Sequence, residues 1–302
     1  MTEIIQKNCQ VEQLDLGVIQ VTGKNAGQFL QGQLTCDVTE VNAKHCRLGA
    51  HCDAKGRVQA TFYLFFHQGC YYFLLPREMI VHLLSCLTKY AVFSAVNLID
   101  VSQSWKVIGV AGPLIGDILN KYALLPSANT TVTSSDVIIS VAIAACIPRF
   151  VLLTAYNKLL PFIDHTFNEM TVNDWHLLDI IAGISTIYPE TIGQFTPHQL
   201  NYPAIGGVSF TKGCYIGQEI IARTHYLGKS KSRLYRLAFQ AEKNFSAGTL
   251  IQDSKGATQG VLIIAAHEKN NHFQALACLQ TQTISHTIYL GSSQGPVLRF
   301  LE

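Results

Sequence analysis

The sequence predicts an α+β fold of antiparallel or mixed sheets with helices on one face, followed by a small β-barrel. In the first 230 residues, helical stretches alternate with strands. Most neighbouring strands are joined by short turns, which favours antiparallel or mixed sheets over a doubly wound parallel sheet. From Ser232 onward the helical periodicity disappears, and short apolar stretches alternate with Gly, Asn and Ser turns, as in a barrel or sandwich. We expect an α+β region over 1–230, with two interleaved subdomains of which one spans roughly 45–125, and a barrel over 231–302.

The N-terminal elements follow from apolar stretches and the turns between them. Residues 17–21 predict a strand, and Asn25 is placed to cap a short helix after it. Residues 46–75 predict two or three strands, because 53–56 and 67–69 have the composition of turns.

The remaining elements follow in chain order. Apolar residues recur at helical spacing over 79–87, and strands are expected at 96–101 and 107–110. Further elements are a helix over 114–122, strands near 137–143 and 150–154, and helices around 158–168 and 172–182. Six barrel strands are expected at 234–239, 249–252, 260–265, 273–279, 287–290 and 297–301.

Composition excludes several classes of protein. Of the 302 residues, 48% are hydrophobic and 14% charged, which is enough apolar side chain to offset the entropy of ordering the chain and excludes intrinsic disorder. A net charge of +2 indicates no global field for nucleic acid or membrane. The longest apolar run, 137–147, is too short to span a bilayer. No signal peptide is visible and the nine cysteines are expected to be mostly buried reduced thiols, so we expect a cytoplasmic location.

One segment, 206–223, predicts chemistry. Four glycines fall among its first twelve residues, so the backbone turns tightly or approaches another group closely. Cys214 lies between Lys212 and an expected helix start at 217–219, and both a cation and a helix N-terminus stabilise a thiolate. A buried thiol beside a tight turn accounts for the segment equally well.

Two further groups of residues have alternative interpretations. A basic stretch with interleaved tyrosines comprises Arg223, Tyr226, Lys229, Lys231, Arg233, Tyr235 and Arg236. It fits RNA or an anionic cofactor tail, although a solvated linker into the barrel is the simpler interpretation. The second group lies within 31–37 and 49–57, where carboxylates, a histidine and cations beside turns could bind a flat heterocycle with a carboxylate tail, unless they serve the turns alone. The His-Cys pairs at 45–46 and 51–52 match no zinc spacing, and we expect no metal site.

The stretch Lys-Gly-Cys-Tyr-Ile-Gly-Gln-Glu at 212–219 resembles the signature of the YgfZ-type folate-binding family, relatives of the T-protein (aminomethyltransferase) of the glycine cleavage system. Residues 29–37, 51–57, 195–201 and 226–233 fit the same family. The resemblance implies a T-protein-like fold around a tetrahydrofolate pocket, with the cysteine motif near its mouth. It also implies support of iron–sulfur enzymes, such as a radical tRNA methylthiotransferase.

The resemblance assigns roles to individual residues. The reactive pair would be Cys214 and Lys212, with Cys214 also able to ligate an iron–sulfur cluster transiently. The other motif residues are Gly213, Tyr215, Gly217, Gln218 and Glu219. The candidate folate-binding residues are Gln33, Asp37, His51, Asp53, Lys55, Arg57, Trp175 and Arg223.

The chain departs from the family pattern at two places. Ala60 and Thr61 stand where the T-protein carries an acidic pair, and neither can act as an acid or base. Asp179 and Ile181 replace an arginine and a glutamate of many relatives, which bears on the affinity for folate and its preferred form. We therefore expect a tetrahydrofolate-binding accessory protein for iron–sulfur enzyme assembly or repair that supports tRNA thiomethylation. A non-catalytic folate- or RNA-binding scaffold is the alternative, and an active aminomethyltransferase is less favoured.

Overall fold

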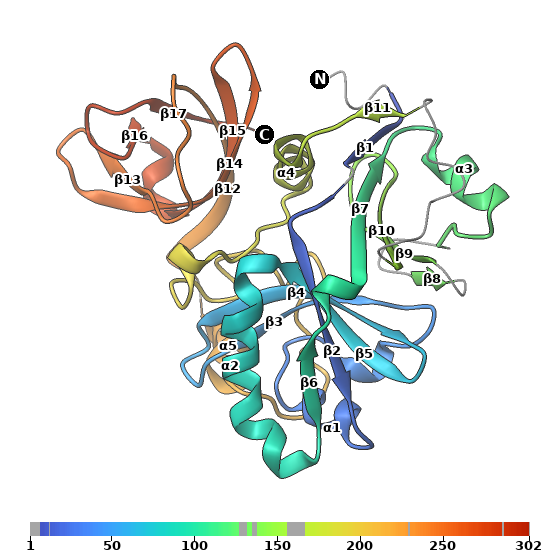
Figure 1. Cartoon of the computed structure of the whole chain (residues 1–302). Coiled ribbons are helices and arrows are strands. Elements are labelled where there is room, and N and C mark those ends of the chain that lie inside the picture. The colour runs from blue at the N-terminus through green and yellow to red at the C-terminus, as the bar shows by residue number, and fades with distance from the viewer. Residues whose placement is uncertain are drawn as a thin grey trace.

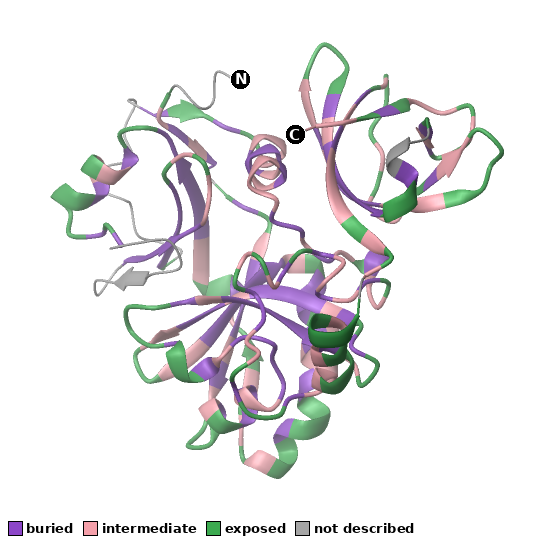
Figure 2. Ribbon diagram, turned by 180° about the vertical axis from the view of Figure 1, so that it is seen from behind, coloured by how far each residue is buried: buried purple, intermediate pink, exposed green. Residues whose placement is uncertain are grey.

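The computed structural model describes residues 7–11, 13–126, 132–134, 138–155, 167–228, 230–285 and 287–301. Within them the chain forms two open sheets and a closed barrel, with helices beside them (Figure 1). The strands of the open sheets are largely buried, whereas outer helices and turns are exposed (Figure 2). The helix expected around 158–168 lies outside the described residues except for its last two positions.

The first sheet has five antiparallel strands in the order β3-β4-β5-β2-β6. Its strands are β2 (Leu16–Thr22), β3 (Arg47–Cys52), β4 (Val58–His67), β5 (Cys70–Pro76) and β6 (Asn97–Asp100). The strands expected over 17–21 and 46–75, and the turns at 53–56 and 67–69, are confirmed. Short turns therefore join β3 to β4 and β4 to β5 as antiparallel neighbours, as the sequence predicts.

Two helices accompany this sheet, α1 (Ala26–Gln31) and α2 (Ile80–Ala91). The helical spacing predicted over 79–87 is confirmed, since α2 buries Leu83 and Leu87. Asn25 occupies the N-cap position of α1 but makes no side-chain cap; its amide instead donates to the carbonyl of Ser94 at 3.1 Å. Asn25 therefore ties the start of α1 to the end of the α2 region.

The second sheet is mixed, with the order β11-β1-β7-β10-β9-β8 and one parallel pair, β1 with β11. Its strands are β1 (Cys9–Val11), β7 (Trp105–Ala111), β8 (Val132–Ser134), β9 (Ile138–Ala142), β10 (Arg149–Ala155) and β11 (Asn168–Glu169). The helix expected over 114–122 is α3 (Ile115–Lys121). The residues of the two open sheets interleave along the chain.

Helix α4 (Val172–Ala182) lies between the mixed sheet and the barrel (Figure 1). A capping box of Thr171 and Asp174 starts it, and Gly183 ends it at φ 69°, where glycine is favoured. The amide of Asn173 donates to the carbonyl of His267 at 2.7 Å and accepts from its N–H at 2.9 Å. These paired bonds fix α4 against the barrel.

The barrel closes in the order β12-β15-β14-β13-β16-β17. Its strands are β12 (Ser232–Gln240), β13 (Leu250–Asp253), β14 (Thr258–Lys269), β15 (His272–Gln280), β16 (Ile288–Leu290) and β17 (Val297–Phe300). All six expected strands are confirmed, and so is the α+β class with mixed sheets. The division into domains at 230 and the subdomain over 45–125 stay predictions. No helix among the described ranges is both long and apolar enough to cross a bilayer.

Candidate functional site

The segment 206–223, which carries the signature, lies against the residues around Thr35. Thr35 and Gly207 are in contact although they are 172 positions apart in the sequence. The hydroxyl of Thr35 donates to the carbonyl of Gly207 at 2.7 Å, and the N–H of Ser209 donates to the carbonyl of Thr35 at 2.8 Å. Further along, the N–H of Ile216 donates to the carbonyl of Gly32 at 3.2 Å. The signature at 212–219 and the matching segment at 29–37 are therefore joined by hydrogen bonds to main-chain carbonyls.

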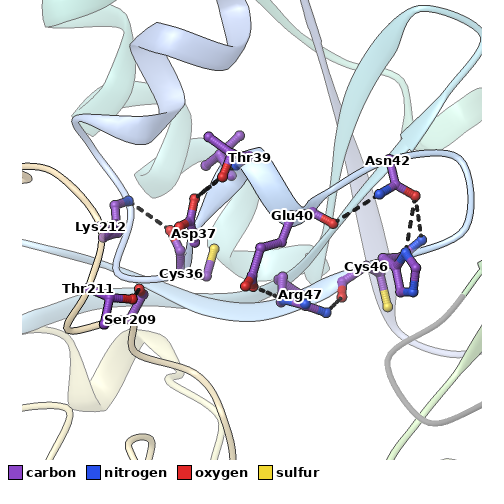
Figure 3. Close-up of polar contacts among 12 residues, drawn as sticks. Cys36, Asp37, Thr39, Glu40, Asn42, Cys46, Arg47, Ser209, Thr211 and Lys212 are labelled. Atoms are coloured by element: carbon purple, nitrogen blue, oxygen red, sulfur yellow. Dashed lines mark hydrogen bonds and ion pairs between the residues drawn. The ribbon is translucent and has the colours of Figure 1, made fainter.

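Lys212 is buried and holds this junction together. Its ammonium donates to the carbonyl of Leu34 at 2.8 Å and to that of Cys36 at 2.7 Å (Figure 3 shows the bond to Cys36), and it lies 5.1 Å from the ring centre of Tyr215. Burial lowers the pKa of Lys212 to about 8, against the opposing influence of Cys36 and Asp37. We expected this cation beside the Cys214 thiol. The structure gives its ammonium these two main-chain partners, which position the junction, and its action on the thiol stays a prediction.

Cys214 is an exposed free thiol ahead of helix α5 (Gln218–Leu227). The expected helix start at 217–219 is confirmed, and the side chain of Gln218 accepts from the N–H of Tyr215 at 3.3 Å. Gly213 and Glu219 are exposed. The thiol is therefore accessible to solvent, which excludes the alternative of a buried cysteine.

The third sequence block, 51–57, supports the start of α5. Gly217 has φ 81°, and a Cβ there would lie 2.5 Å from the carbonyl oxygen of Asp53. The Asp53 carboxylate accepts from the N–H groups of Lys55 and Arg57, both at 2.9 Å. The Arg57 guanidinium donates to the carbonyl of Gln194 at 2.8 Å. The contacts of Asp53 and Arg57 are those of a tight turn against which the signature packs.

The other expected pocket residues in this region also have internal partners. Asp37 accepts from Gln31 at 2.9 Å and from Thr39 at 2.7 Å (Figure 3 shows the bond to Thr39). Burial tends to raise the pKa of Asp37, but these hydrogen bonds outweigh it and lower the pKa. His51 is buried and its Nδ1 lies 3.0 Å from the carbonyl of Gln33; burial lowers its pKa. Gln33 is buried with an unpartnered side-chain oxygen.

A cavity of about 120 Å³ lies elsewhere, between the two open sheets and α4. Its lining residues are Leu14, Asp15, Leu16, Leu48, Thr61, Phe62, Tyr63, Leu74, Leu75, Pro76, Ile143, Val151, Val172, Trp175, His176, Asp179, Ile184, Thr186, Tyr188 and Tyr202. Of the expected site residues only Trp175 is among them. Thr61 and Asp179, one residue from each of the two departures from the family pattern, also line the cavity.

A buried arginine that sequence reasoning missed supports the cavity wall. Arg149 comes from β10, and its side chain is 0% exposed. Its Nη2 donates to the Asp179 carboxylate at 2.7 Å, and its guanidinium lies 5.0 Å from the ring centre of Trp175. The remaining Nε and Nη1 atoms are buried and have no hydrogen-bond partner among the described residues. An isolated arginine in an apolar strand, complementary to the reversed charge at 179, was the available sequence signal.

Polar groups converge on the same cavity from other elements. The Tyr188 hydroxyl lies 3.4 Å from Nε2 of His176, whose pKa is lowered by burial despite the opposing effect of Asp179. The Tyr202 hydroxyl donates to the carbonyl of Ser185 at 2.9 Å. An ionised carboxylate, aromatic walls and few polar groups are what a flat ring with N–H donors requires.

Ala60 and Thr61 stand where the T-protein carries its acidic pair, and neither side chain is an acid or a base; of the two, Thr61 lines the cavity. The hydroxyl of Thr61 accepts from the N–H of Ile187 at 3.0 Å, and Ala60 is fully buried. Across the described part of the chain, no three His, Cys, Asp or Glu side chains converge on a possible metal site. Arg223 is exposed on α5, outside the cavity lining.

Comparison with known proteins places the chain among relatives of similar length. It is 33% identical over 253 residues to the tRNA-modifying protein YgfZ of Colwellia psychrerythraea, covering 82% of this chain and 76% of that protein. For the proteins of the same name from Hamiltonella defensa and Yersinia pestis, identity is 37% over 232 residues and 36% over 238. The shares covered are 75% and 78% of this chain, and 69% and 72% of those proteins.

A family model and a solved structure agree with these relatives. The model of the GCVT N-terminal domain matches residues 3–147. The glycine cleavage system aminomethyltransferase T from Bartonella henselae superposes with a TM-score of 0.75 over 99% of this chain and 86% of that one, at 13% identity, which confirms the T-protein-like fold. Since three relatives above 30% identity align over more than two thirds of their own length, the chain belongs to the YgfZ family.

Proposed function

We propose that the protein binds tetrahydrofolate and acts as an accessory factor for the assembly or repair of iron–sulfur enzymes that modify tRNA, such as a radical tRNA methylthiotransferase. The name of the relatives, tRNA-modifying protein YgfZ, supports the link to tRNA modification. The location we propose is the cytoplasm, and the nine free cysteines support a reducing compartment.

The observation that carries the folate part is the Asp179 carboxylate in the cavity wall. Arg149 keeps it paired on one side, and its side chain is 16% exposed on the other. The aminopyrimidine edge of a pterin presents N–H donors, which an ionised carboxylate accepts in charge-assisted hydrogen bonds. At about 120 Å³ the cavity greatly exceeds the space for one water, roughly 10–15 Å³. It therefore suits the ring, with the glutamate tail of the folate extending outward.

Cys214 supplies the proposed chemistry. It lies exposed outside the cavity lining, so its thiol would meet a client protein or a cluster rather than the enclosed pterin. It would act in redox or covalent exchange, or as a transient cluster ligand. Aminomethyl transfer is not proposed, because Ala60 and Thr61 offer no acid or base.

Calorimetric titration with tetrahydrofolate tests the folate part. The wild type should bind one equivalent, and Asp179→Asn should weaken binding at least about tenfold, because a hydrogen bond to a charged group is lost. Asp117→Asn, the same change on the exposed side of α3, serves as the control and should bind normally. Absence of binding by the wild type, or equal binding by Asp179→Asn, would refute the cavity as the folate site.

Complementation of a strain lacking the endogenous factor tests the thiol part. Cys214→Ala should abolish complementation while leaving the melting temperature and folate binding near wild type, since the side chain is exposed. Cys146→Ala, at the other exposed cysteine, is the matched control and should complement. Full activity of Cys214→Ala would remove the thiol from the mechanism and leave the folate site standing.

A further inference from the structure

Helix α5 and the loop before it carry a cluster of aromatic rings, His198, Phe210, His225 and Tyr226, here called the α5 aromatic surface. Phe210 and His225 stack with ring centres 3.7 Å apart and an interplanar angle of 16°. Tyr226 stands nearly perpendicular to His225 at 4.9 Å and is 67% exposed. His198 lies behind them, 5.9 Å from His225. Large exposed aromatic rings held in fixed orientation are a preorganised stacking surface.

Within the described residues, no hydrogen bond or ion pair joins the histidines of this surface to an acidic side chain. Burial lowers the pKa of His198, and the neighbouring His225 lowers it further. Both ring nitrogens of His198 are buried without a hydrogen-bond partner. A neutral His198 therefore supports the cluster as a flat ring rather than as an ion-pair member.

Exposed cations occur on α5 and where the chain leaves it, and Glu219 is an exposed acidic residue in the first turn of the helix. Arg223 is exposed on the same helix, and Lys231 and Arg233 are exposed where the chain enters β12. Lys229 lies outside the described residues. No acidic residue occurs in the sequence from 220 to 241. The two tyrosines of the basic stretch therefore differ in their surroundings. Tyr226 is free to stack, whereas Tyr235 packs on Phe300 of the barrel at 5.5 Å.

We propose that the α5 aromatic surface binds single-stranded RNA, with an unpaired base stacked on the exposed ring of Tyr226, which His225 supports edge-on, and phosphates bound by Arg223, Lys231 and Arg233. Aromatic rings accept any base by stacking, and cations beside them hold the backbone. A protein partner would also cover Leu227, which is 85% exposed, but stacked rings beside three exposed cations, against the one exposed acid of α5, Glu219, are complementary to a polyanion. The surface lies apart from the cavity and its role does not depend on folate binding.

Fluorescence anisotropy with a labelled single-stranded oligoribonucleotide of about 12 nucleotides tests the proposal. We expect binding that weakens steeply between about 50 and 200 mM salt, and weaker binding of the same strand in a duplex. Tyr226→Ala should weaken binding of the single strand roughly tenfold, and Tyr226→Phe should retain it, because the ring alone stacks. Tyr90→Ala, at an exposed tyrosine of α2, is the matched control and should bind as wild type.

A charge variant separates phosphate contacts from stacking. Arg223→Gln should reduce the slope of log K against log salt by about one. The proposal is overturned if the wild type does not bind the strand, if Tyr226→Ala and Tyr90→Ala bind alike, or if the duplex binds as tightly. It is also overturned if Tyr226→Ala keeps RNA binding but fails to complement in cells, which would assign the surface to a protein partner.

Discussion

The guanidinium of Arg149 and the carboxylate of Asp179 form a buried ion pair of 2.7 Å between β10 and α4. The pair joins the mixed sheet to the helix that carries Trp175, and it faces the cavity through Asp179 alone. Gly109 on β7 completes the arrangement, since a Cβ there would lie 2.7 Å from the Trp175 ring. The wall of the candidate folate site is thus built from three elements distant in sequence.

Breaking this pair should destabilise the fold. Arg149→Met leaves the Asp179 carboxylate without its partner, and we expect the free energy of unfolding in urea to fall by about 3 kcal/mol. The double variant Arg149→Met/Asp179→Leu should recover much of that loss, because no uncompensated charge remains. A double variant as unstable as the two single changes added together would show that the pair does not act as a unit.

The glycines of the signature should differ in their tolerance of a side chain. Gly217→Ala places a methyl group against the Asp53 carbonyl at a left-handed φ, and should cost more than about 1 kcal/mol in guanidinium unfolding. Gly213→Ala meets nothing within 4 Å and should cost less than about 0.5 kcal/mol. Equal costs would contradict the packing of α5 on the 53–56 turn.

Stability should decrease in mild acid because of buried histidines. Burial lowers the pKa of His51 in the folded state below its ordinary value of 6.5. Between the two pKa values the unfolded chain binds more protons than the folded chain, so the free energy of unfolding rises with pH. The contribution of His51 to stability is therefore complete above pH 6.5 and decreases as the pH falls below that value. His176 has the same direction of shift and adds to the effect.

The contribution of one histidine can be isolated by substitution. Urea midpoints measured from pH 7 to 5 should decline less steeply for His51→Asn, whose amide can still donate to the Gln33 carbonyl. His45→Asn, at an exposed position, should follow the wild-type curve. Identical pH profiles for His51→Asn and the wild type would mean that His51 is not held neutral by the fold.

Local patterns predict the strands, helices and barrel because turns and apolar periodicity act over a few residues. The candidate site depends on contacts between residues that are far apart in the sequence. Residues 29–37, 51–57 and 212–219 do come together, as the resemblance implies, but through main-chain contacts and a tight turn. The buried ammonium of Lys212 is an example, since it donates to the carbonyls of Leu34 and Cys36, which are far from it in the sequence. Arg149, which supports the cavity wall, lies 30 positions from Asp179, so no local pattern predicts that the two side chains pair.

A crystal structure of the protein with tetrahydrofolate tests the central claim most directly. The account predicts the pterin ring inside the cavity, in contact with Trp175, with its ring N–H or amino group within hydrogen-bond distance of Asp179. Folate bound instead beside His51 and the 53–56 turn, with the cavity between the sheets unfilled, would contradict it.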